Sequence, residues 1–214
     1  MGQYYKPVSL DKLKEKDKNE TWLYTHQFGH QGLKIMEHSY LQNDFMQAVE
    51  VLLTPFGPWY KHHIVWAGDY ADSESERKQE GLNSLDVEES GNIYDMADED
   101  RGLEPIAPYI IQQIKDENKI DLDEYRYIVN HDEKLFVDKQ HVKAYKASWM
   151  DEGEEGWKIH PLSLLVAEGN GRGGGDYYEG SSDYELVGSW ARQSISIEKE
   201  IPEGYTELEV SFKE

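Results

Sequence analysis

The chain has 214 residues, a formal net charge of −21 at pH 7 and no cysteine. This length is enough to bury a hydrophobic core, and the missing cysteines exclude disulfide scaffolds, thiolate catalysis and cysteine-ligated zinc. No stretch approaches the roughly 20 apolar residues of a membrane-spanning helix, and the opening MGQYYKPV has no signal-peptide core. We expect a cytoplasmic protein that folds as one domain over residues 1–214.

The acidity is regional. Residues 1–66 hold seven lysines and seven acids, whereas residues 67–214 hold 15 basic and 36 acidic side chains. Such a field repels nucleic acid and anionic membranes, and it attracts basic protein surfaces or cations. The one cluster of lysines (Lys12, Lys14, Lys16 and Lys18) is interleaved with acids, so direct binding of nucleic acid is disfavoured. The simpler alternative is that the charge serves solubility.

Local patterns in the first third of the chain predict strands around one helix. Residues 3–8 have strand composition and pair with residues 22–25 as a hairpin, in which Pro7 suits an edge. Asn43 or Asp44 caps a helix over residues 45–53, whose apolar side chains recur at helical spacing. Residues 63–67 predict a central strand.

The rest of the chain alternates in the same way. Residues 103–116 predict a helix with Pro105 near its start, and with Ile106, Tyr109, Ile110 and Ile114 facing a core. Residues 125–129 and 134–137 predict a β-hairpin, and residues 184–197 and 205–212 predict closing strands. The fold class that we expect is α+β, a mostly antiparallel sheet with a few packing helices.

Residues 69–104 differ from their surroundings, because they hold 13 acids and three bases together with several turn-forming residues. We interpret them as an inserted or mobile acidic segment. Its densest part contains Asp95, Asp98, Glu99 and Asp100, which we expect to contact a basic partner surface.

An internal comparison indicates that the domain consists of two distantly similar halves. An offset of 124 residues aligns GLKIMEHSYL at 32–41 with GWKIHPLSLL at 156–165, with five identities in ten positions. The same offset pairs Ser39 with Ser163 and Trp66 with Trp190. Coincidence is the alternative, since two short copies are weak evidence for a repeat.

The stretch EGNGRGGGDYY at 168–178 is the strongest candidate for a ligand loop. It lacks the Gly-Lys-Ser/Thr of a Walker A motif and the strand–helix frame of a dinucleotide fingerprint. Backbone amides of such a loop can still hold an anion, with Arg172 adding a charge, although nearby acids oppose it. The predicted ligand-binding residues are Gly171, Arg172, Gly173, Gly174, Asp176 and Tyr177, and a purely structural loop is the alternative.

Other candidate chemistries have weaker support. His26, His30 and His38, with Asp69 and Asp72, contain ligand types for zinc or manganese but no recognised spacing. We interpret them as surface histidines, with His38 bonded to a buried partner, and His62 and His63 likewise. Ser39 and Ser163 have no nearby base in a recognisable order and are taken as structural. We therefore predict no metal, no cofactor and no identifiable catalytic residue.

Several long stretches resemble an uncharacterised family of bacterial and bacteriophage proteins. They are MGQYYKPV at 1–8, HQFGHQGLKIMEHSYLQNDF at 26–45, WAGDYAD at 66–72, YIVNHDEKLFVD at 127–138, and IHPLSLLVAEGNGRGGGDY at 159–177 with GSWA at 188–191. The resemblance covers most of the chain except residues 73–102. It implies no activity, only a mobile-element setting in which evasion of host defence is a frequent role for small acidic proteins.

Two functional hypotheses follow. The first is an acidic interaction protein that binds a basic surface of a host protein and inhibits a nucleic-acid-processing defence effector. The second is a small-ligand protein, for nucleotide or phosphate, or a hydrolase, that uses residues 168–178. The sequence favours the first, with an enzyme less expected than a binding protein.

Overall fold

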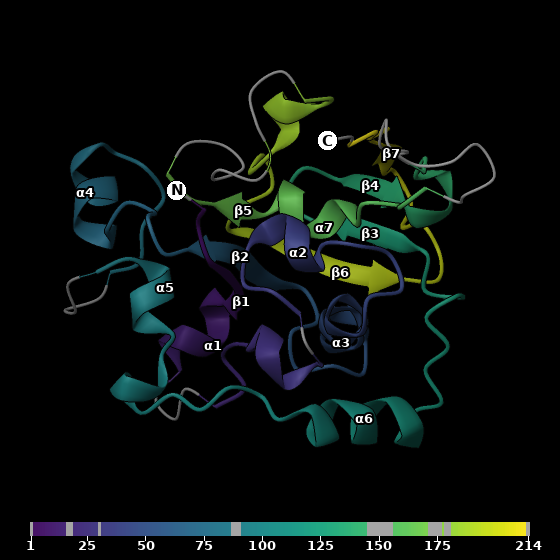
Figure 1. Ribbon diagram of the computed structural model, residues 1–214. Helices are drawn as coiled ribbons and strands as arrows, with labels where there is room; N and C mark the ends of the chain where they lie inside the picture. The colour runs from purple at the N-terminus through teal and green to yellow at the C-terminus, as the bar shows by residue number, and fades with distance from the viewer. Residues whose placement is uncertain are drawn as a thin grey trace.

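Seven strands form one mixed sheet in the computed structural model, which describes residues 2–15, 19–29, 31–86, 91–144, 156–170, 177 and 181–212. Six strands follow the order β1-β2-β6-β3-β4-β7, and β5 pairs with β2. The pairs are antiparallel except β4–β7 and β2–β5. The strands are β1 (Tyr5–Ser9), β2 (His62–Gly68), β3 (Tyr127–Asn130), β4 (Leu135–Asp138), β5 (Ala167–Glu168), β6 (Gln193–Glu198) and β7 (Thr206–Glu207) (Figure 1). The prediction of an α+β domain with a mostly antiparallel sheet is confirmed.

The strand β2 is the centre of the molecule. Its first residues pair with β6, its later residues pair with β5, and its other edge pairs with β1. Side chains of a strand alternate between the two faces of the sheet. Ile64 and Trp66 accordingly enter the main core, whereas Val65 and Ala67 enter a second core on the opposite face. The predicted central strand is therefore buried on both sides.

The main core is covered by helices whose starts are visible in the sequence. The helix α3 (Asp44–Leu53) begins after Asn43, whose side chain accepts hydrogen bonds from the backbone N–H of Phe45 (2.9 Å) and Met46 (3.4 Å). Its predicted apolar face is fully buried. Three further helices lie in this layer: α2 (Ile35–His38), α6 (Pro108–Glu117) and α7 (Pro161–Leu165) (Figure 1).

The helix α6 starts later than predicted, with Pro108 in its first turn, so Pro105 precedes the helix. Three of the four predicted core residues lie in or against the main core, and Ile111 joins them at 4% exposure. The fourth, Tyr109, is 71% exposed. Tyr109 is therefore a wrong core assignment.

The acidic segment contributes to the second core. The helices α1 (Leu10–Lys14), α4 (Glu74–Gln79) and α5 (Ile93–Met96), with the 3₁₀ turn η2 (Glu99–Arg101), are the regular elements near this face of β1 and β2 (Figure 1). Five apolar side chains of residues 69–104 are buried there: Leu85, Ile93, Met96, Ala97 and Leu103. The described part of the acidic segment is thus attached to the sheet by burial of apolar surface.

The predicted hairpin of residues 3–8 is present in a reduced form. The N–H of Ser9 donates to the carbonyl of Thr21 (2.9 Å), and the N–H of Leu23 donates to the carbonyl of Pro7 (3.4 Å). The main ladder of β1, however, is with β2. A single sequence gives no direct signal for this pairing, since the partners lie more than 50 residues apart.

The hairpin β3–β4 is confirmed, whereas the closing strands are shorter than expected. Residues 184–197 contain the 3₁₀ turn η4 (Tyr184–Leu186) followed by turns before β6, and β7 covers two residues. The remaining 3₁₀ turns are η1 (Thr25–Gln27) and η3 (Lys139–His141). In the part of the chain that the structure describes, no helix has the length and apolar content needed to cross a bilayer.

A duplication is not shown by the structure. The offset of 124 residues sets β2 against residues 186–192, which form the end of η4 and turns. The two best-matched segments nevertheless touch each other. Ser163 Oγ donates to Ser39 Oγ at 2.6 Å, and the N–H of His160 donates to the carbonyl of Ser39 at 2.9 Å. The duplication stays a prediction, and both serines have structural partners.

Candidate functional site

The acids predicted to bind a partner lie on α5 and η2. Asp95, Glu99 and Asp100 have exposed side chains. Asp98 is engaged within the protein, because it caps η2 by accepting from the N–H of Asp100 (3.0 Å) and pairs with the ammonium of Lys6 (3.3 Å). Burial opposes the ionised form of Asp98, but these contacts outweigh it and lower its pKa. Three of the four predicted carboxylates are thus available to a partner.

Lys6 joins this acidic region to the sheet. Its side chain is buried, with the ammonium 4.4 Å from the ring centroid of Trp22 and 4.0 Å from that of Tyr94. It also donates to the carbonyl of Ala97. Burial lowers the pKa of Lys6 against the opposing effect of Asp98. A lysine on β1 therefore fixes the position of the α5–η2 connection.

A second anchor, under α4, consists of three buried charged residues and the half-buried Arg77. Arg192 donates to Glu168 through Nε (2.6 Å) and Nη2 (2.7 Å), and to Glu74 through Nη1 (2.9 Å) and Nη2 (2.5 Å). Arg77 adds an ion pair to Glu168 at 3.4 Å. Burial alone would lower the pKa of Arg192, but the two carboxylates raise it above its ordinary value. The two positive charges of the arginines therefore offset the two negative charges of the glutamates.

The exposed acids held by these anchors form what we call the acidic face. Only Lys78 and Arg101 are exposed bases in residues 69–104 among the described residues, and Lys78 is paired with Asp86 at 2.8 Å. Three large apolar side chains are exposed beside the acids, Tyr70 at 48%, Leu82 at 47% and Tyr4 at 45%. The acidic face comprises Asp72, Glu76, Glu80, Asp86, Asp95, Glu99, Asp100 and Glu104.

Five of the six predicted ligand-binding residues lie outside the described residues: Gly171, Arg172, Gly173, Gly174 and Asp176. Tyr177 is described and fully buried, with its ring packed edge-on against Phe212 at a centroid distance of 5.6 Å. Its position is that of a core residue.

The start of this stretch rests on a buried glutamine. Gln3 accepts hydrogen bonds from Tyr5 Oη (2.9 Å) and from the N–H of Asn170 (3.3 Å). Gly169 approaches so closely that a Cβ would lie 2.4 Å from Gln3 Oε1, which explains the glycine. The Nε2 of Gln3 is buried and is one of two buried side-chain atoms without a partner among the described residues.

The histidines that were weighed as metal ligands and interpreted as surface or structural residues have other partners or environments where the structure describes them. His38 Nδ1 donates to the carbonyl of Gly32 (3.1 Å), and its Nε2 accepts from Trp66 Nε1 (2.9 Å), an assignment that follows from the indole being a donor only. Burial lowers the pKa of His38 to about 4. The ring is thus neutral and both nitrogens are used. His26 is exposed, and His30 lies outside the described residues.

His62 and His63 also have local partners. His62 Nδ1 lies 2.9 Å from Ser9 Oγ, and His63 Nδ1 lies 3.0 Å from Asp11 Oδ2. These bonds connect β2 to the start of α1, which agrees with a structural role.

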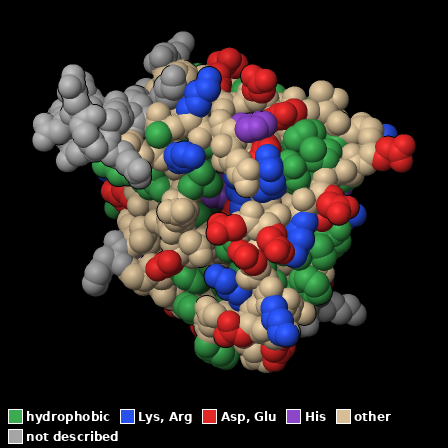
Figure 2. Space-filling model, turned by 90° about the vertical axis from the view of Figure 1, so that its right-hand side faces the viewer, with side chains coloured by type: hydrophobic (Ala, Val, Ile, Leu, Met, Phe, Trp, Pro, Cys, Tyr) green, Lys and Arg blue, Asp and Glu red, His purple; other side chains and the backbone are tan. Residues whose placement is uncertain are grey.

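A cleft of about 1520 Å³ lies among the end of α6, the start of β3, η3 and residues 156–158. Figure 2 views the molecule from the side on which the end of α6 and η3 lie in Figure 1, and shows Lys and Arg side chains among Asp and Glu. Ala144 and Gly156, which flank the undescribed residues 145–155, belong to its lining. The charged and aromatic lining residues are Tyr40, Glu50, Lys115, Lys119, Asp121, Asp123, Arg126, Lys139, Trp157 and Lys158.

A buried triad lies at this cleft. Glu50 Oε1 accepts from Lys139 Nζ and from His160 Nε2 (2.9 Å), and all three side chains are buried. His160 Nδ1 accepts from the N–H of Leu162 (3.2 Å), so its proton is on Nε2. Burial lowers the pKa of His160, and the pKa of Glu50 is lowered because Lys139 and His160 outweigh its burial. The triad is an ion pair with a neutral histidine.

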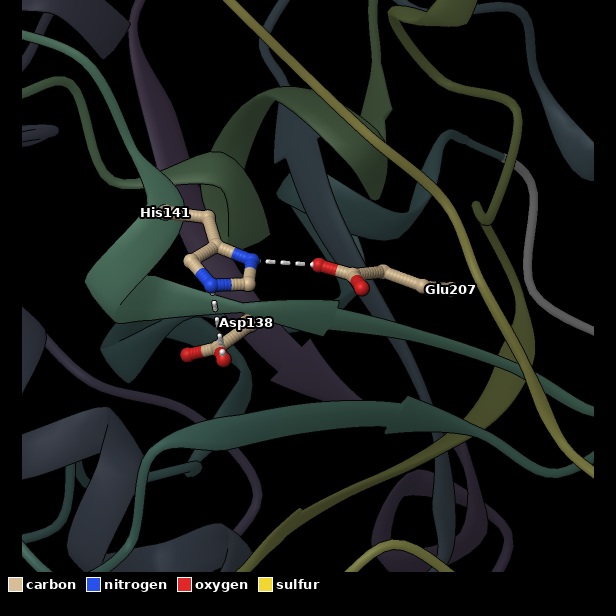
Figure 3. Close-up of side chains that lie close together, drawn as sticks. All are labelled: Asp138, His141 and Glu207. Carbon is tan, nitrogen blue, oxygen red and sulfur yellow. Dashed lines mark hydrogen bonds and ion pairs between the residues drawn. The ribbon is translucent and has the colours of Figure 1, made fainter.

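Asp138, His141 and Glu207 form a second cluster, beside a cavity of about 470 Å³. Their potential ligand atoms lie within 4.8 Å of one another, and among the described residues no other such group occurs. Figure 3 shows the two carboxylates facing different nitrogens of the ring: Glu207 Oε1 is 2.7 Å from Nδ1 and Asp138 Oδ2 is 3.7 Å from Nε2.

This arrangement suits a proton better than a metal. Asp138 already accepts from Arg126 Nε (3.0 Å) and Nη2 and from the N–H of Gln140, so a metal would compete with these bonds for the carboxylate. The hydrogen bond to Glu207 and the charge of Asp138 raise the pKa of His141. Sequence reasoning missed the cluster, since His141 and Glu207 are 66 residues apart and match no spacing motif.

No protein-family model, curated protein or solved structure matches the chain.

Proposed function

We propose that the protein is an interaction protein whose acidic face binds a basic surface of a partner protein. The partner that fits this chemistry is a protein that processes nucleic acid, because such proteins carry channels lined by lysine and arginine for phosphate. Carboxylates presented in that channel would compete with nucleic acid and inhibit the partner. A defence effector of the host is the expected example.

The observation that supports this proposal is the composition of the acidic face. Eight exposed acids stand against two exposed bases, and Tyr4, Tyr70 and Leu82 offer exposed apolar surface beside them. The N–H of Tyr4 donates to Asp69 Oδ1 (3.1 Å), and the N–H of Asp69 donates back to the carbonyl of Tyr4 (3.0 Å). These bonds hold the backbone of Tyr4 beside Asp69, the residue that precedes Tyr70. Charge steers association, whereas buried aromatic side chains supply most of the affinity.

The anchors add preorganisation. Lys6 fixes the α5–η2 connection, and Arg192 fixes α4. Acids held in place lose less conformational entropy on binding than acids on a free chain. The acidic face is thereby suited to a defined partner as well as to solubility.

The test is capture of partners from a host lysate with a charge-reversed variant, Asp95→Lys/Glu99→Lys/Asp100→Lys. We expect the captured protein to bind in a salt-sensitive manner, to be released by added duplex DNA, and to be lost with this variant. A matched control, Glu200→Lys/Glu203→Lys/Glu209→Lys, makes the same change of charge at exposed acids elsewhere. Equal capture by both variants, or no effect of DNA, would contradict the proposal.

The alternative, a nucleotide or phosphate ligand at residues 168–178, stays a prediction because most of that stretch lies outside the described residues. Its test is thermal stabilisation by a nucleotide or a divalent ion that is lost with Arg172→Ala or Asp176→Ala.

A further inference from the structure

The cleft beside η3 gathers lysines that lack a carboxylate partner. Seven described lysines are ion-paired: Lys6, Lys12, Lys14, Lys34, Lys78, Lys139 and Lys199. Lys115, Lys119 and Lys158 all line the cleft, and among the described residues none of them has an ion pair. Six described lysines have no ion pair to a described residue, and three of these six surround this one cleft. In a chain with 43 acids and 22 lysines and arginines, such a group of cations is a candidate site for an anion.

The fourth cation of the cleft is buried and oriented. Lys139 is 9% exposed, and its ammonium is held by Glu50. An ammonium has three N–H donors. Glu50 Oε1 is the one acceptor found for Lys139 in the described part of the chain, so donors remain for an anion in the cleft. Glu50 itself is fixed by His160 (2.9 Å), which makes the ammonium a preorganised contact.

The cleft also presents an aromatic surface. Trp157 is 41% exposed, and its ring lies 6.3 Å from that of Tyr40. Indole rings stack on planar bases with little dependence on the base. The volume of about 1520 Å³ exceeds that of an ordinary small-molecule pocket. Three acids of the lining, the exposed Asp121 and Asp123 and the buried Glu50, oppose an anion, but four lysines outnumber them.

We propose that this cleft binds a nucleotide with two or more phosphate groups, with the phosphates on Lys115, Lys139 and Lys158 and the base against Trp157. This site is distinct from residues 168–178 and is independent of the acidic face. The acids of α4 and α5 lie at the other end of the molecule from η3 (Figure 1), and salt screens charges beyond about 8 Å. Salt therefore weakens the effect of those acids on an anion in the cleft.

Calorimetric titration of the full chain in about 0.15 M salt, where that screening holds, tests the site with ADP, pyrophosphate and adenosine as probes. We expect ADP to bind with one-to-one stoichiometry, pyrophosphate more weakly, and adenosine most weakly. The variant Lys115→Ala/Lys158→Ala should bind ADP about tenfold more weakly, as for loss of charge-assisted hydrogen bonds. The control Lys14→Ala/Lys134→Ala removes the same charge away from the cleft and should change the affinity less than about twofold.

A separate variant tests the base contact. Trp157→Leu should weaken ADP binding about tenfold and leave pyrophosphate binding unchanged, because only the base stacks on the indole. Thermal melting should show that all three variants fold, since the altered side chains are not buried. Absence of binding by all probes, or equal losses in the cleft and control variants, would overturn the site. Equal binding of ADP and pyrophosphate, insensitive to Trp157→Leu, would overturn the nucleotide as its ligand.

Discussion

Two groups of buried charges differ in how completely they are paired. Beneath the acidic face, Arg192 binds Glu74 and Glu168 through four hydrogen bonds of 2.5–2.9 Å, so its guanidinium is occupied on both sides. At the cleft, Lys139 has one carboxylate partner, Glu50, and lines open space. The first group is closed and holds elements together. The second keeps donors for a ligand, which is the property expected of a binding site.

The largest loss of stability is expected when the group of Arg192, Glu74 and Glu168 is disrupted. Arg192→Met removes the cation that Glu74 and Glu168 share and leaves Arg77, 3.4 Å from Glu168, as the remaining described cation of the group. Breaking a buried pair in this way costs about 3 to 5 kcal/mol of unfolding free energy. Urea denaturation at neutral pH measures the loss, with Arg101→Met as the exposed control. A loss below about 1 kcal/mol, as for a surface ion pair, would show that the group is open to water.

The corresponding change at the cleft should cost less. Glu50→Gln removes the carboxylate beneath Lys139 but leaves its ammonium next to the cleft, where water or an anion can compensate. We expect a loss of about 2 kcal/mol, below the usual cost of breaking a fully buried pair.

Adding an anion sharpens this result. Pyrophosphate should stabilise wild type, by binding the folded state alone, and Glu50→Gln/Lys139→Met should regain part of the lost stability while losing that stabilisation. A loss for Glu50→Gln as large as that for Arg192→Met would mean that the two groups are equally closed.

Neither group was predictable from sequence, whereas several local elements were. The signals for α3 are close together in the sequence, because its capping residue Asn43 directly precedes the periodic apolar residues of 45–53. They predict the helix without any contact from distant parts of the chain. Arg192 meets a glutamate 118 residues away, and Lys139 meets one 89 residues away. These contacts follow from strand order, which composition does not encode.

The width of the apolar stripe on α6 was also not determined by the sequence. Ile110 and Ile114 face the core as expected, but the apolar pattern does not decide which neighbour of Ile110 is buried with it, and in the structure this is Ile111 and not Tyr109. The exposure of the acids at 95, 99 and 100, by contrast, follows from the cost of burying unpaired charge.

A buried but uncharged titratable residue, His38, can be compared with the two groups of buried charges. His38 is fully buried and neutral, with a pKa of about 4 against an ordinary value of 6.5. Its folded-state pKa is lowered, so its contribution to stability is complete above pH 6.5 and is lost as pH falls toward 4. As pH falls, the histidine of the unfolded chain binds a proton first. This lowers the free energy of unfolding by about 2 kcal/mol between about pH 7 and pH 5.

The variant His38→Gln isolates this dependence, because glutamine can accept from Trp66 and donate to Gly32 without titrating. Urea denaturation at the two pH values should show a smaller pH dependence than wild type. His26→Gln, at an exposed histidine, should behave like wild type. Identical slopes in wild type and His38→Gln would mean that the histidine protonates in the folded state without cost.

The smallest pH dependence of stability is expected from His141, which is mostly exposed and lies between two carboxylates (Figure 3). Glu207 and Asp138 raise its pKa, so its contribution is complete below the ordinary value and is lost as pH rises through the raised one. An NMR titration should give a pKa for His141 above 6.5, and Glu207→Gln should lower it because the charged acceptor is gone. Adding zinc should leave the titration unchanged, since Arg126 already occupies Asp138. If zinc instead displaces the proton of His141 at neutral pH, the cluster is a metal site in which Asp138, His141 and Glu207 are the ligands.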